Sequence, residues 1–146
     1  MPKILRYTLA AIVLLLIVSV RIFETKLFYD PLLTFFKDSN RVELPPFDDV
    51  KLYTNVFFRY MINLLLIVLF VKLIFWKQNY VKFTIIVGVL TLVILLPLYG
   101  FMLNNQLNFG EMIFFYVRRF LIQPMLLIIL VPCFYYQEIR NKKATN

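Results

Sequence analysis

Four long apolar stretches constrain the fold of this sequence more than any other feature. The clearest spans 83–103 and carries no charged side chain, and the other three cover about 4–23, 57–76 and 112–136. An α-helix needs about 20 residues to cross the hydrocarbon core of a bilayer. We therefore expect a chain that crosses a membrane four times.

The composition excludes most other classes of protein. Hydrophobic residues make up 62% of the sequence and charged residues 16%, whereas an average soluble domain is about half apolar and a quarter charged. A small soluble globule with this excess would leave large apolar patches in water. This argues against a soluble enzyme, a disordered chain and a disulfide scaffold. The sequence predicts an all-α fold, an integral membrane four-helix bundle that forms a single membrane domain over 1–146.

The residue inventory also excludes several kinds of chemistry. The sequence has no histidine, one cysteine (Cys133) and three glycines. A histidine base, a metal site built from histidine or several cysteines, an internal disulfide and a glycine-rich phosphate loop are therefore ruled out. We expect no metal, no cofactor and no catalytic residue, so the chain is predicted not to be an enzyme.

The first apolar stretch has the layout of a secretory signal, because Lys3 and Arg6 precede its apolar core. A cleavage site with small residues at the usual spacing does not follow, since the chain continues as Ser-Val-Arg-Ile-Phe over 19–23. We therefore expect a retained membrane anchor.

Basic residues mark one side of the membrane. The N-terminus, the connection between the second and third stretches and the C-terminal tail are rich in lysine and arginine and contain one acid, Glu138. Around the long first loop, about 24–56, acidic and basic residues balance. Because short basic segments stay in the cytoplasm, we expect both termini there. The net charge of +8 then reflects membrane topology and not a nucleic-acid partner.

The first outer loop is too apolar to be a simple linker. Asp30 is placed to cap a short helix and Pro31 to start it, and a broad apolar face follows. We expect an interfacial helix here, which either seals the rim of the bundle or docks a membrane partner. Asp48 or Asp49 then caps a helix that continues into the second span. The docking candidates are Phe28, Tyr29, Asp30, Phe35 and Phe36.

A polar face runs down the second apolar stretch. Arg59 and Asn63 are four residues apart, so they lie on the same side of a helix. Lipid satisfies neither side chain, and this face should therefore turn toward protein or a wet cavity. In the third stretch, Gly88 and Thr91 could allow another helix to pack closely.

The fourth apolar stretch has a similar polar face near its outer end. Tyr116, Arg119 and Gln123 share one side of the predicted helix, and Arg118 lies on a neighbouring side. Pro124 follows and should bend the helix, because proline removes a backbone hydrogen bond. Such a bend would let the segment before it lean along the outer interface.

The polar residues of both stretches are expected in the outer leaflet, where they converge. Internal pairing of the arginines with Asp30, Glu24 or Glu111 is one use that stays open. The others are binding to a partner protein, and holding a phosphate or carboxylate of a lipid or substrate. The candidate binding residues are Arg59, Asn63, Tyr116, Arg118, Arg119 and Gln123.

The sequence also resembles a known family along nearly its whole length. The segments that carry the resemblance are Phe28-Tyr29-Asp30-Pro31, Phe58-Arg59-Tyr60-x-x-Asn63 and Phe115-Tyr116-Val117-Arg118-Arg119-Phe120-Leu121-Ile122-Gln123-Pro124. They are similar to segments of the exosortase F system-associated membrane proteins, which are small multi-pass proteins of flavobacteria and their relatives. The run Tyr-x-Arg-Arg-Phe-Leu-Ile-Gln-Pro is the most specific part of the resemblance.

The resemblance implies an accessory partner of exosortase F in the bacterial inner membrane. Exosortases process proteins that carry a C-terminal sorting tail, and they use a cysteine together with arginine and histidine. This chain lacks histidine, and its Cys133 is expected near the cytoplasmic end, so it departs from the enzyme's pattern and should not be the catalyst. The expected partners are the lipid bilayer and exosortase F or its sorting-tail substrates. The alternative is a small lipid- or anion-handling membrane protein, such as a transporter or flippase subunit.

Overall fold

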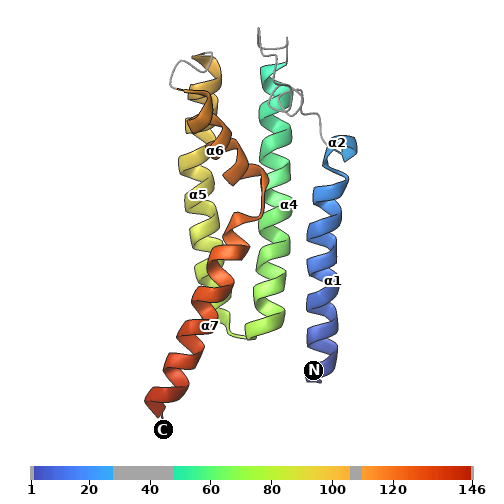
Figure 1. Cartoon of the computed structure of the whole chain (residues 1–146), viewed down its shortest axis with the longest axis vertical. Helices are drawn as coiled ribbons and strands as arrows, with labels where there is room; N and C mark the ends of the chain where they lie inside the picture. Colours follow the sequence, from blue (N-terminus) through green and yellow to red (C-terminus); the bar gives the residue numbers. More distant parts are fainter. Residues whose placement is uncertain (1, 28–47, 106–109, 146) are drawn as a thin grey trace.

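The computed structural model describes residues 2–27, 48–105 and 110–145 and shows long helices standing side by side in a bundle (Figure 1). The helices are α1 (Lys3–Ile22), α2 (Glu24–Leu27), α4 (Asp49–Phe75), α5 (Gln78–Asn104), α6 (Glu111–Ile122) and α7 (Met125–Thr145). The predicted all-α bundle of membrane type is confirmed. The expected interfacial helix lies outside the described residues, as do its docking candidates Phe28, Tyr29, Asp30, Phe35 and Phe36.

Three of these helices, α1, α4 and α5, are each long and apolar enough to cross a membrane. α6 and α7 meet the same criterion only as a pair, which is broken between Ile122 and Met125 and bent by 66°. The bend predicted at Pro124 is therefore confirmed. Its cause is that proline lacks the N–H that would donate to the carbonyl four residues earlier, so the helix stops and restarts. Counted as one span, the bent pair makes four crossings.

The helices extend beyond the apolar stretches that indicated them. α4 begins at Asp49, as expected for a helix that starts at Asp48 or Asp49 and continues into the second span, whereas α7 runs to Thr145 and does not end near 136. Hydropathy marks the part of a helix that lies in hydrocarbon, whereas backbone hydrogen bonding continues through the polar turns at its ends. Asp48 occupies the N-cap position of α4, although its side chain makes no capping hydrogen bond.

α4 is the central helix of the bundle. It packs against α1 and α5, and also contacts α6 and α7. One core lies among α4, α5, α6 and α7, where Leu52, Tyr99 and Phe114 are fully buried. A second core joins α1 to α4 through side chains that include Val13 and Phe70. The packing of α4 therefore determines where its neighbours stand.

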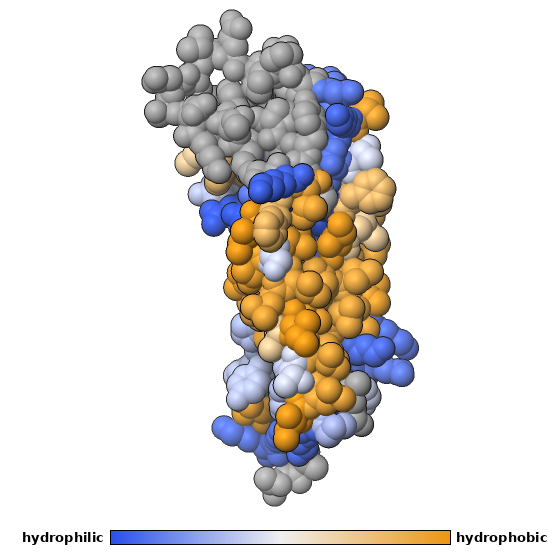
Figure 2. Space-filling model, turned by 90° about the vertical axis from the view of Figure 1, so that its right-hand side faces the viewer, coloured by the Kyte–Doolittle hydropathy of each residue, from blue (hydrophilic) through white to orange (hydrophobic). Residues whose placement is uncertain are grey.

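The two ends of the bundle differ in what they carry. The start of α1, the α4–α5 connection and the end of α7 lie together at one end, and α6 lies toward the other (Figure 1). We call the first the basic end, because Lys3, Arg6, Lys142 and Lys143 belong to it. Figure 2 shows one face of the bundle, with an apolar band across its middle and hydrophilic residues toward both ends. Such a band is typical of a protein surrounded by lipid.

Candidate functional site

Arg59 lies inside the bundle and is engaged there. Its residue surface is only 3% exposed, and its Nη2 donates a hydrogen bond to Oε2 of Glu24 on α2. The same carboxylate oxygen lies 3.2 Å from Nη1 of Arg21. Glu24 is one of the three acids named for internal pairing. This arginine therefore joins α4 to α2 through a buried ion pair.

Asn63 is also buried, and it supports the break between α6 and α7. Its Nδ2 donates a 2.8 Å hydrogen bond to the carbonyl oxygen of Ile122, the last residue of α6. Carbonyls at the end of a helix lack partners within it, and lipid offers none. The amide of α4 thus satisfies a carbonyl that the interruption at Pro124 exposes.

Replacing Asn63 with leucine should lower the free energy of unfolding by about 1–3 kcal/mol, because it leaves a buried carbonyl without its donor. Unfolding of the detergent-solubilised chain in increasing dodecyl sulfate measures this. Asn55→Leu is the matched control, since the Asn55 amide donates to the carbonyl of Lys51 in its own helix, at 2.7 Å. Equal stability of the two variants would contradict the role given to Asn63.

The two adjacent arginines of α6 point to different sides of the helix. Arg118 is buried, with 6% of its surface exposed, and its neighbours Val117 and Leu121 belong to the core. Arg119 is exposed, and its Nε donates to Oε1 of Gln123 at 3.1 Å. Successive residues of a helix are rotated by about 100°, so neighbours in sequence face in different directions.

One side of α6 remains, which we call the α6 surface and define as Met112, Tyr116 and Arg119, which are exposed, and Gln123, the half-buried C-cap residue. Met112 is 68% exposed and Tyr116 60% exposed. The four residues follow one another at spacings of four, three and four, which places them in a row along one side of a helix. The α6 surface keeps three of the six candidate binding residues together.

The convergence of the three arginines that we expected from the sequence stays a prediction, although they differ in burial. Arg59 and Arg118 are buried in the bundle, whereas Arg119 is exposed on the α6 surface. The alternative of an anion-handling protein requires a pocket that opens outward and is lined by all three guanidinium groups. The arrangement gives no support to that alternative.

A second cluster was treated at the sequence level only as a topology signal. Lys72, Lys77 and Lys82 surround the α4–α5 connection and line a common pocket. The available signal was the absence of any acid between 72 and 82 together with the single tryptophan of the chain at position 76. In the described residues, no group of three or more histidine, cysteine, aspartate or glutamate side chains could hold a metal ion.

Comparisons of the chain with protein-family models, with curated proteins and with solved structures give no match. The family resemblance of the sequence therefore stays a prediction.

Proposed function

We propose that the chain is a non-catalytic accessory membrane protein of an exosortase-type protein-sorting system. In this proposal the α6 surface binds the enzyme or the sorting tail of its substrate. The observation that carries the proposal is that Tyr116 and Arg119 are both exposed on one side of a helix whose other side forms the core. Both residues also belong to the segment on which the family resemblance is most specific.

The charge of Arg119 supports a partner at this surface. Within the part of the chain that the structure describes, its hydrogen-bond partner is the neutral amide of Gln123, so no carboxylate there balances it. A cation on the surface of a membrane helix is costly unless it reaches headgroups or an anion. The planar guanidinium pairs well with a carboxylate, and tyrosine and arginine often dominate binding between proteins. A carboxylate of the enzyme or of a sorting tail fits this site.

The placement of the remaining groups supports a role without catalysis. Cys133 is the only thiol of the chain and lies on α7, the helix that leads away from α6 to the basic end. The sequence has no histidine to activate it. We further propose that the protein resides in the bacterial inner membrane with the basic end in the cytoplasm, because positively charged ends are retained there.

Co-purification with a co-expressed exosortase tests the proposal. The double variant Tyr116→Ala/Arg119→Ala should recover about tenfold less enzyme than the unchanged chain, since it removes two residue types that commonly dominate interfaces. The matched control is Tyr136→Ala/Arg140→Ala, which removes an exposed tyrosine and an arginine one turn apart on α7 at the basic end.

Thermal unfolding of both variants in detergent shows whether each remains folded. Undiminished recovery of the enzyme with folded Tyr116→Ala/Arg119→Ala protein would refute the proposal. Equal losses in the two double variants would also count against it, because binding would then not depend on the α6 surface.

A further inference from the structure

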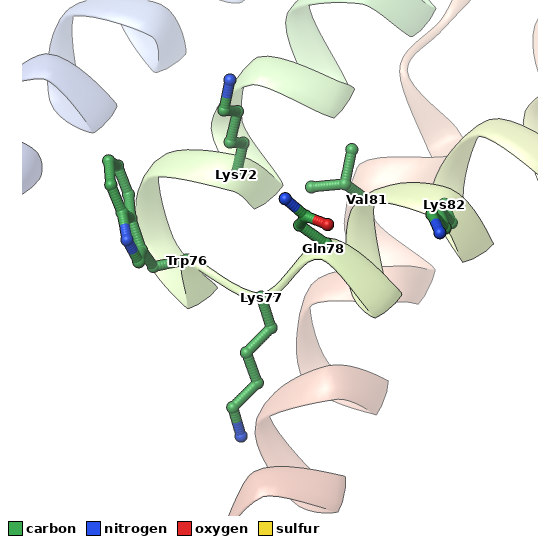
Figure 3. Close-up of a pocket in the computed structure, with 6 residues that line it drawn as sticks. All are labelled: Lys72, Trp76, Lys77, Gln78, Val81 and Lys82. Carbon is green, nitrogen blue, oxygen red and sulfur yellow. The ribbon is translucent and has the colours of Figure 1, made fainter.

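We propose that a pocket at the α4–α5 connection binds the phosphate group of an anionic phospholipid. The pocket lies at the basic end, away from the α6 surface, so the inference does not depend on the proposed sorting function. It has a volume of about 440 Å³. Its lining residues are Lys72, Trp76, Lys77, Gln78, Val81 and Lys82 (Figure 3).

Two of the three lysines are available to a ligand. Lys77 points away from the others toward α7 (Figure 3), where its Nζ lies 3.3 Å from Oε1 of Glu138. Lys72 and Lys82 are exposed and form no ion pair with the acids that the structure describes. They come from different helices, Lys72 from α4 and Lys82 from α5, so both helices contribute a lysine to the lining of the pocket.

The backbone at the connection adds to the positive potential. α5 begins at Gln78 after Lys77 in the N-cap position, and no side chain caps this end. The free N–H groups of a helix N-terminus carry a partial positive charge and bind phosphate readily. The opposite charge at the end of α4 is already satisfied, because Arg6 donates to the carbonyls of Leu73 and Ile74 at 3.1 and 3.0 Å.

The apolar surroundings favour a lipid over a soluble phosphate. Trp76 closes the turn in the left-handed conformation (φ 51°, ψ 25°), and the Arg6 guanidinium lies 4.9 Å from the centre of its ring. Leu69 precedes Lys72 by three residues and Ile86 follows Lys82 by four, and both are exposed. At these spacings they continue the pocket's two walls into the apolar band. A headgroup phosphate at the lysines would leave its acyl chains along this surface.

Trp76 is the only tryptophan of the chain, so the fluorescence of the purified protein reports on this pocket. The protein is reconstituted in phosphatidylcholine vesicles containing phosphatidylglycerol, with one of the two lipids brominated near the top of its acyl chains. Brominated phosphatidylglycerol should reach half-maximal quenching at about a tenfold lower mole fraction than brominated phosphatidylcholine.

The variant Lys72→Gln/Lys82→Gln should reduce this preference to less than about twofold, because the lipid then meets no unpaired ammonium in the pocket. Lys142→Gln/Lys143→Gln removes the same charge at the same end without touching the pocket and should keep the preference, since separated surface charges are screened within about 8–10 Å.

Three results would overturn the inference. The first is equal quenching by both brominated lipids in the unchanged protein. The second is the same loss of preference in both double variants, which would indicate general surface attraction. The third is reversal of phosphatidylglycerol quenching by inorganic phosphate at equal concentration, which would identify a soluble anion as the ligand.

Discussion

Replacing Glu24 with glutamine should lower the free energy of unfolding by about 1.5–3 kcal/mol, because the Arg59 guanidinium, buried within the bundle, loses the charge of one carboxylate and keeps only a neutral amide oxygen at that position. Arg59 is 3% exposed and stays charged, since arginine does not release its proton in proteins. Arg21→Gln is the control. Its side chain is half exposed and pairs with the same carboxylate, and such exposed pairs contribute about 0–1 kcal/mol.

The double variant Glu24→Gln/Arg59→Met distinguishes an ion pair from simple packing. Removing both charges should recover at least part of the stability lost in Glu24→Gln alone, because the buried guanidinium is then removed together with the carboxylate that it pairs with. Unfolding in dodecyl sulfate is measured for the unchanged chain, Glu24→Gln, Arg59→Met and the double variant, which together form a double-mutant cycle. Losses that simply add up would contradict the assignment and would return Arg59 to the list of possible anion-binding groups.

The membrane-spanning architecture could be predicted because hydropathy alone determines it. The uncharged stretch 83–103 became α5, and the break at Pro124 followed from the missing N–H of proline. The start of α4 could be predicted, because Asp48 and Asp49 are suitable cap residues ahead of the second span. The end of α7 could not, since its polar turns after 136 carry no apolar signal, yet they continue the same backbone hydrogen bonding.

The sequence predicted which side of each helix carries the candidate residues, but it did not predict which groups these residues bind. The spacing of Arg59 and Asn63 predicted a side of the second span that avoids lipid, and both are indeed buried. Their partners, Glu24 and the carbonyl of Ile122, depend on how α2, α4 and α6 pack, which no local pattern encodes. Arg118 and Arg119 are adjacent on a helix, and the structure buries the first and exposes the second.

At Gly88, too, the sequence indicated a close helix contact, whereas the residues that make the contact follow from how the helices pack. The sequence singled it out, with Thr91, as a place where another helix could approach. α4 does approach there. The hydroxyl of Tyr60 donates a 2.6 Å hydrogen bond to the Gly88 carbonyl, and a Cβ on Gly88 would lie 3.2 Å from Cγ of Leu64 and closer still to both of its methyl groups.

Gly88→Leu should therefore destabilise the bundle by about 3 kcal/mol, because an inserted side chain forces α4 and α5 apart and breaks the Tyr60 hydrogen bond. Val89→Leu, at a residue that is exposed on the same helix, should change stability by less than about 0.5 kcal/mol. The double variant Gly88→Leu/Leu64→Ala should recover part of the stability lost in Gly88→Leu, since the new leucine side chain then meets a smaller neighbour. Dodecyl sulfate unfolding measures all three variants. If Gly88→Leu were as stable as Val89→Leu, the close contact between α4 and α5 could not be the feature that holds these two spans together.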